Sequence, residues 1–181
     1  MPRPATAPTI ETQRLRLRAH RPEDLGAALV MWSDTDVTRY IGGRPSTEQQ
    51  AWSRLLNYAG HWALLGFGYW AVEEKASSTF VGELGFADFK RDIDPAMRGV
   101  PEAGWTFASP VHGRGYATEA LRAVVRWGDE QFSPDRTVAL IDADNLASIR
   151  VAEKCGYREF MRARYSERPT IFFERIGAVV R

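Results

Sequence analysis

The chain has 181 residues, the length of one ordinary domain. Hydrophobic residues make up 44% of it and charged residues 26%, a balance that excludes an intrinsically disordered chain. The 24 Lys and Arg nearly cancel the 23 Asp and Glu, so the net charge of +1 gives no general attraction to nucleic acid or to an anionic membrane.

Cysteine content and hydropathy favour a cytoplasmic protein. The single cysteine, Cys155, excludes an internal disulfide framework and a cysteine-rich zinc site. No apolar run reaches the length that crosses a bilayer, and residues 1–8 lack the apolar stretch of a signal peptide. Their three prolines predict a disordered leader, so we expect one domain over residues 9–181.

Residues 10–20 carry the first strand pattern. Leu15, Leu17 and Ala19 alternate with arginines, which indicates a half-buried strand whose arginine face lies in solvent. The elements expected next are a helix opening at 21–24, a loop over 33–45, a helix from a capping box at 46–49, and strands at 67–72, 79–86 and 102–108.

The second half of the chain alternates helices and strands. The expected elements are helix 115–132, strand 137–141, helix 147–154, and strands near 157–165 and 170–176. A hairpin followed by this alternation predicts an α/β protein with a mixed sheet and helices on both of its faces.

One loop predicts an anion site. A strand ends near Ala108, and a helix begins near Gly115 after a glycine-containing loop. The first amides of a helix have no internal acceptor and carry the positive end of its dipole. Because Gly113 and Gly115 lack a Cβ and Arg114 adds a cation, we expect a phosphate or diphosphate on the amides of residues 113–118.

Several ligands satisfy such a loop. The Gly-Lys-Ser/Thr of a P-loop is absent, and a dinucleotide fingerprint would have a small residue where Thr118 stands. A nucleotide-dependent oxidoreductase therefore stays an alternative, as does a loop with no ligand. About thirty residues later a second polar motif, Asn145-x-x-Ser148, directly follows a strand, and Asn145 is a natural helix N-cap.

The two segments His112-Gly-Arg-Gly-Tyr-Ala117 and Asn145-x-x-Ser148, the latter followed by Glu153-Lys-Cys-Gly-Tyr157, resemble the signature motifs of the GNAT acyl-CoA N-acyltransferase superfamily. The segments 12–18 and 118–120 resemble its RimJ/RimL branch. His112 departs from the usual Gln or Arg, and Tyr157 from the usual Phe. The resemblance covers nearly the whole chain and implies the GNAT fold, a twisted mixed sheet with two splayed parallel strands.

The resemblance also implies that acetyl-CoA lies between the splayed strands 102–108 and 137–141, without a metal. The residues that would contact it are Trp105, Thr106, Phe107, His112, Gly113, Arg114, Gly115, Tyr116, Ala117, Thr118, Asn145 and Ser148. Arg150 and Lys154 are candidates for the 3′-phosphate, with solvated helix charges as the alternative.

The implied chemistry is direct attack of a neutral amine on the thioester. A carboxylate acting through water would remove the proton, and the candidates are Glu102, slightly preferred, and Glu83. A backbone N–H near Phe107 would stabilise the oxyanion, and Ser148 would protonate the thiolate. A covalent route through Cys155 is rejected, because a small buried residue is normal at a helix end.

The implied acceptor is a small-molecule amine or a protein N-terminus. We expect its pocket between loop 33–45, the helix from 46 and the hairpin near 166–169. Four aromatic residues could form a wall of this pocket or belong to the core: Trp32, Tyr40, Trp70 and Trp105. Asp34 and Asp36 could attract a cationic amine or be solvated loop charges. A non-catalytic module that only binds coenzyme A is the second hypothesis, and homodimerisation is expected from the habit of the branch.

Overall fold

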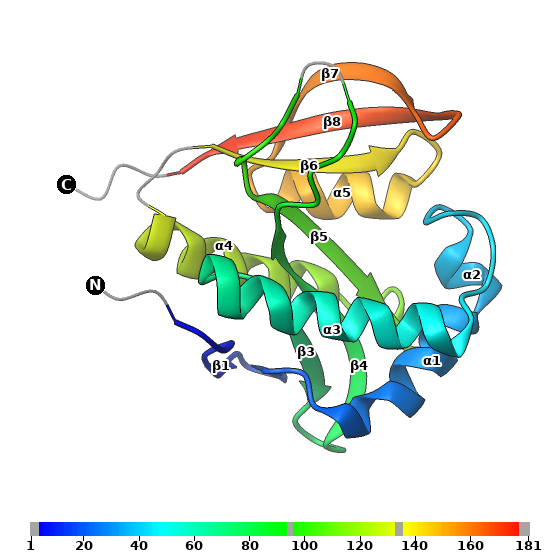
Figure 1. Ribbon diagram of the computed structural model, residues 1–181, viewed down its shortest axis with the longest axis vertical. Coiled ribbons are helices and arrows are strands. Elements are labelled where there is room, and N and C mark those ends of the chain that lie inside the picture. The colour runs from blue at the N-terminus through cyan, green and yellow to red at the C-terminus, as the bar shows by residue number, and fades with distance from the viewer. Residues whose placement is uncertain (1–3, 94–95, 133–135, 178–181) are drawn as a thin grey trace.

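The computed structural model describes residues 4–93, 96–132 and 136–177. Within these ranges eight strands form one sheet in the order β1-β2-β3-β4-β5-β6-β8-β7, and only β5 and β6 are parallel neighbours. The strands are β1 (Ile10–Glu11), β2 (Leu15–Arg18), β3 (Tyr69–Glu74), β4 (Thr79–Ala87), β5 (Glu102–Phe107), β6 (Arg136–Asp142), β7 (Arg158–Tyr165) and β8 (Arg168–Ile176). The predicted mixed sheet is confirmed (Figure 1).

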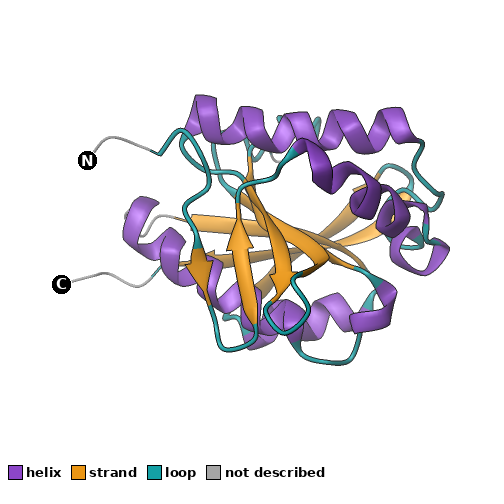
Figure 2. Cartoon of the chain, turned by 90° about the horizontal axis from the view of Figure 1, so that it is seen from below, coloured by secondary structure: helices purple, strands orange, loops and turns teal. Residues whose placement is uncertain are grey.

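Helices cover both faces of this sheet, as predicted (Figure 2). The helices are α1 (Leu25–Ser33), α2 (Thr35–Thr38), α3 (Glu48–Leu65), α4 (Tyr116–Phe132) and α5 (Leu146–Lys154), with short 3-10 turns at η1 (Pro22–Asp24) and η2 (Ser109–Val111). The helices α1 and α3 pack together on one face, and α4 and α5 pack together on the other. None of the described helices has the length and hydropathy that a bilayer-crossing segment needs.

The predicted strand over residues 10–20 is wrong in one respect, because it is two antiparallel strands. Thr12 turns the chain: its amide donates to the Leu15 carbonyl, and its hydroxyl accepts from the Leu15 amide, each over 2.9 Å. Leu15 and Leu17 are fully buried, in agreement with the alternation. Arg18, however, is buried rather than solvated, because Asp24 and Glu73 both pair with its guanidinium.

The predicted loop over 33–45 contains the short helix α2. The side chain of Asp34 accepts from the Asp36 amide and caps this helix. The sequence pattern predicted a loop at Asp34 and so missed the helix. The following helix begins one residue later than predicted, because Thr47 and Gln50 form the capping box instead of Ser46 and Gln49.

The segment predicted as a leader packs against the sheet where it is described. Ala7 is buried, and the Pro8 carbonyl accepts a 2.7 Å hydrogen bond from the Trp70 indole. Residues 1–3 lie outside the described range. Trp70 is itself fully buried and meets Trp62 and Trp127 edge to face, so it belongs to the core and not to a pocket wall.

The parallel strands β5 and β6 separate along their length. Their register holds a single pair, Glu102 with Val138, next to a 3.0 Å bond from the Val138 amide to the Pro101 carbonyl. Beyond that point β6 continues with β8 while β5 continues with β4. The sheet therefore opens at the end of β5 that leads into η2 and α4.

Candidate active site

Two cavities meet at the open end of β5. A cavity of about 430 Å³ lies by the start of α4 and α5, and one of about 970 Å³ lies between α3, β5 and β6. Six residues line both of them: Tyr40, Ile41, Trp105, Thr106, Asn145 and Ser148. A long ligand in the smaller cavity would thus present one end to the larger one.

The loop before α4 has the features of the predicted anion site. Gly113 and Gly115 have φ of 75° and 79°, which favours glycine, and a Cβ on Gly113 would meet no atom within 4 Å. In the described part of the chain, the amides of Gly113, Gly115 and residues 116–118 have no hydrogen-bond acceptor. Five unpaired N–H groups therefore surround open space, with the positive end of α4 behind them.

The turn between β1 and β2 holds this loop in place through hydrogen bonds. Glu119, in the first turn of α4, accepts from the Thr12 hydroxyl and from the amide and guanidinium of Arg14. Arg14 also donates to the Arg114 carbonyl over 2.9 Å. Because Glu119 already accepts these three hydrogen bonds, its carboxylate does not compete with a ligand for the unpaired amides at the start of α4.

Arg114 is the one predicted cofactor residue that lines neither cavity. Its guanidinium pairs with Glu74 over 2.9 Å, and the Tyr116 hydroxyl donates to the same carboxylate. The sequence predicted that Arg114 contacts the anion, whereas in the structure its guanidinium pairs with Glu74 at the end of β3.

The edge of β5 beside the smaller cavity has backbone N–H groups without a hydrogen-bond partner in the described chain. The Ala108 amide donates to the Val81 carbonyl of β4. Because the N–H and C=O groups of successive strand residues point to opposite edges of the strand, those of Trp105 and Phe107 point away from β4, toward the gap between β5 and β6. His112 Nε2 donates to the Phe107 carbonyl over 2.8 Å and fixes the turn after the strand. The N–H groups of Trp105 and Phe107 therefore lie along the cleft.

The start of α5 faces the same place. The Asn145 side chain accepts from the Ser148 amide over 3.1 Å and caps the helix. Within the described residues the Ser148 hydroxyl and the Asn145 side-chain nitrogen Nδ2 have no hydrogen-bond partner, and both residues line both cavities. Arg150 and Lys154 are exposed and line only the smaller one.

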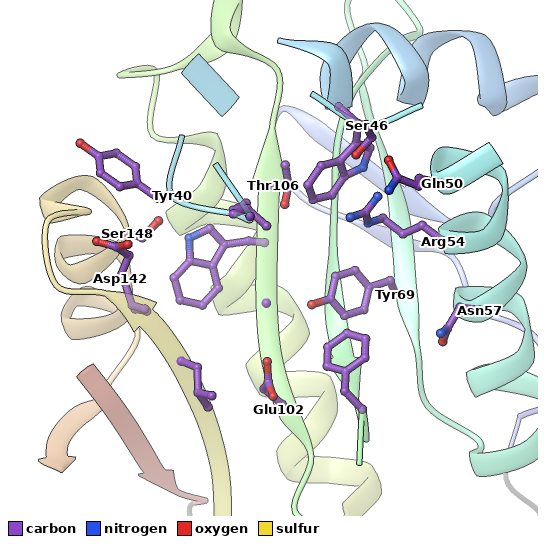
Figure 3. Close-up of a pocket in the computed structure, with 18 of the residues that line it drawn as sticks. Tyr40, Ser46, Gln50, Arg54, Asn57, Tyr69, Glu102, Thr106, Asp142 and Ser148 are labelled. Atoms are coloured by element: carbon purple, nitrogen blue, oxygen red, sulfur yellow. The ribbon is translucent and has the colours of Figure 1, made fainter. Parts of the chain in front are cut away.

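The two predicted carboxylates have different surroundings. Glu102 lines the larger cavity but makes a bidentate ion pair with Arg91, at 2.7 and 2.8 Å. It lies at the closed end of the cleft, four residues and so about 13 Å from Thr106 along the strand. Figure 3 shows Glu102 well away from Ser148.

Glu83 lies beside Thr106, its register partner on β5, and is 2% exposed. Its Oε1 accepts from the Trp32 indole over 2.9 Å and from the Tyr58 hydroxyl over 2.8 Å. Glu83 does not line the cavity, whereas Trp32 and Tyr58 do. The buried His20 Nε2 lies 3.6 Å from Oε2, without a hydrogen-bond partner in the described chain.

Residues from distant elements build the larger cavity. Trp32, Tyr40 and Trp105 of the predicted aromatic wall line it, with Tyr165 from the last hairpin. Gln50, Arg54 and Asn57 line it from α3 (Figure 3). Of the two aspartates proposed to recruit an amine, Asp34 caps α2 and Asp36 lines only the smaller cavity.

The thiol of Cys155 is placed as a core residue. It is buried, lines neither cavity, and burial raises its pKa to about 11. A thiol with this pKa is a poor nucleophile near neutral pH. Across the described residues no group of three or more His, Cys, Asp or Glu side chains is placed to hold a metal.

Comparisons with known proteins agree on one family. The Acetyltransferase (GNAT) domain family matches residues 14–158. YkkB of Bacillus subtilis, itself uncharacterised, is 32% identical over 169 residues, 91% of this chain and 93% of YkkB. A Bordetella pertussis protein assigned to the GnaT acetyltransferase family is 31% identical with a TM-score of 0.83, over 93% of this chain and 99% of that one.

A more distant structure shares the fold alone. RimL, a ribosomal-protein acetyltransferase solved with coenzyme A, is 15% identical with a TM-score of 0.76, over 94% of this chain and 98% of RimL. The family match covers most of the chain, and its range includes β5, the anion loop and α5. The chain belongs to the GNAT acetyltransferase family.

Proposed function

We propose that this protein transfers an acetyl group from acetyl-CoA to a primary amine by direct attack in a ternary complex. The observation that carries the proposal is the junction of two cavities at the open end of β5, with unpaired amides on one side and a buried carboxylate on the other. RimL, which shares the fold, was solved with coenzyme A. We expect the enzyme to act in the cytoplasm.

We place acetyl-CoA in and along the smaller cavity, whose lining offers the groups that it needs. The unpaired amides of Gly113, Gly115 and residues 116–118 would bind the diphosphate, and the backbone N–H and C=O of Trp105 would pair with the amides of the pantetheine arm. Asn145 would add a hydrogen bond to that arm. Arg150 and Lys154, cations without an acidic partner in the described chain, are suited to the 3′-phosphate.

The acetyl transfer itself needs three groups. The amine nitrogen bonds to the thioester carbon as the C–S bond breaks, and the amine loses a proton. We assign the base to Glu83, reached through Tyr58, whose hydroxyl passes its proton to Glu83 as it takes one from the amine. The Phe107 N–H would stabilise the oxyanion, and Ser148 would give the thiolate a proton as it takes one from solvent water.

Glu102 was slightly preferred as the base from the sequence, and its surroundings argue against it. Arg91 donates a hydrogen bond to each of its two oxygens, so the Arg91 guanidinium stands where an amine or a bridging water would have to approach. Its position about 13 Å along the strand from Thr106 also separates it from the junction of the cavities. Glu102 with Arg91 is better suited to closing the far end of the acceptor cavity.

The acceptor class and the RimJ/RimL branch stay proposals, as does a homodimer. The experiment that tests the function is release of free thiol from acetyl-CoA with a panel of amines and N-terminal peptides, with mass spectrometry of the acetylated product. Turnover with at least one amine is the expected result. Binding of acetyl-CoA without turnover of any acceptor would favour a non-catalytic coenzyme A module.

A further inference from the structure

Arg54 is a cation without an acidic partner inside the acceptor cavity. It lines the cavity from α3, and its guanidinium carbon lies 3.7 Å from the centre of the Trp32 ring. Its Nη1 is buried without a hydrogen-bond partner, and none of the ion pairs formed by the described residues includes Arg54. Figure 3 shows the guanidinium reaching from α3 toward the sheet, between Gln50 and Tyr69.

The other charges in this cavity do not offset Arg54. Arg91 and Glu102 neutralise each other, and Asp142 pairs with Arg168 over 2.5 Å. Glu83 lies behind Trp32 and Tyr58, which occupy its Oε1. Of the charged residues that line the cavity, Arg54 and the exposed Arg44 remain without an acid in the described chain. The charges of the cavity lining that have no partner are therefore both positive.

A planar guanidinium with unpaired N–H groups is well matched to a carboxylate, which accepts two parallel hydrogen bonds. The aromatic ring of Trp32 holds the guanidinium in one plane, so little conformational freedom is lost on binding. Gln50 and Asn57, one turn before and about one turn after Arg54 on α3, line the same cavity with amide groups.

We propose that the acceptor carries a carboxylate next to its amino group, as an α-amino acid does, and that Arg54 binds that carboxylate. Trp32 contacts Arg54 with its ring and donates its indole N–H to Glu83, so a single side chain separates the cation from the proposed base. A substrate that reaches both has its carboxylate within a few bonds of its amine. This inference rests on the proposed acetyl transfer.

The proposal separates acceptor classes. A polycationic amine would meet a positive cavity without a free acid, and a protein N-terminus has a neutral peptide group where the carboxylate is required. Small amino acids and their close analogues fit both ends of the cavity.

The test compares the twenty α-amino acids with their α-amides, first by calorimetric binding to protein saturated with coenzyme A and then by thiol release from acetyl-CoA. The wild type should bind at least one free acid about tenfold or more tightly than its amide. Arg54→Gln should remove that preference, Arg54→Lys should retain part of it, and Arg44→Gln, a cation at the same cavity, should leave it unchanged.

The melting temperature and the affinity for coenzyme A should be unchanged in all three variants. Equal or tighter binding of the amides, a preference that survives Arg54→Gln, or no binding of any free acid to the coenzyme A complex would overturn the proposal. A wild type that does not bind coenzyme A at all would instead refute the proposed function on which it rests.

Discussion

At the scale of single residues, the side chain of Glu83 decides the chemistry that we propose. It is a buried carboxylate with two donors on one oxygen and the His20 ring near the other. Tyr58 is buried, and its pKa is raised by desolvation and by the charge of Glu83. A phenol that stays protonated is suited to passing a proton on rather than to keeping a charge.

Replacing Glu83 with Gln should therefore lower kcat while the fold stays intact. The glutamine oxygen still accepts from Trp32 and Tyr58, but it does not take up a proton. We expect kcat to fall about 100-fold or more, with KM for acetyl-CoA unchanged. Glu102→Gln is the control: it should lower the melting temperature by leaving Arg91 without a carboxylate partner and should retain most of kcat. The reverse pattern would move the base to Glu102.

Ser148→Ala tests the proton donor to the leaving thiolate. The cap on α5 uses the Ser148 amide and not its hydroxyl, so the helix start is preserved. Loss of the hydroxyl should lower kcat about 100-fold, as is typical for a general acid, without weakening acetyl-CoA binding. Ser53→Ala, which removes a hydroxyl from α3 in the same cavity, should have little effect. Equal kcat for the two variants would remove Ser148 from the mechanism.

At the scale of elements, we propose that the start of α4 binds the cofactor, and Gly113 is an exposed residue of the loop that leads into it. Asparagine tolerates a positive φ, so Gly113→Asn should fold, but its side chain would enter the space in front of the amides. We expect the Kd for acetyl-CoA, measured by calorimetry, to rise about tenfold to a hundredfold. Gly99→Asn, with φ of 79° and open space around a Cβ, is the matched control and should bind normally.

The sequence predicted elements well where the signal is local. The loop 113–118 and the N-cap Asn145 are contiguous motifs, and the structure brings both to one cleft. It could not predict that Trp32, Tyr58 and His20 surround Glu83, because these side chains come from α1, α3 and the turn after β2 and meet Glu83 only in the folded chain. The α2 turn was missed since its cap, Asp34, is also a common loop residue.

At the scale of the whole molecule, buried ion pairs tie the N-terminal segment to the sheet. Arg18 holds Asp24 through two hydrogen bonds of 2.7 and 2.8 Å and Glu73 through a third of 2.6 Å. Burial alone would raise the pKa of Asp24, but the bonds from Arg18 and the Arg21 amide outweigh it and lower the pKa below its usual value. The sequence pattern did not indicate this, since arginines alternating with leucines are typical of a solvated face.

A lowered pKa in the folded state stabilises the protein above the unfolded pKa of about 3.9, and the contribution is lost as pH falls through the folded pKa. Asp24→Asn should therefore cost about 3 kcal/mol at neutral pH, because it leaves a buried guanidinium short of one partner. Urea denaturation should show the gap between wild type and variant narrowing as pH falls below about 4. A gap that stays constant down to pH 2 would mean that the pair adds no net electrostatic stability.

The central claim is that backbone amides at the start of α4 bind the diphosphate of coenzyme A. The most direct measurement compares the thermal stabilisation of the protein by coenzyme A and by pantetheine, which has the same thiol arm but no diphosphate. Coenzyme A at about a hundred times its Kd should stabilise the wild type by about 2.7 kcal/mol, and pantetheine at the same concentration much less. Equal stabilisation by the two ligands, or none by coenzyme A, would contradict the account.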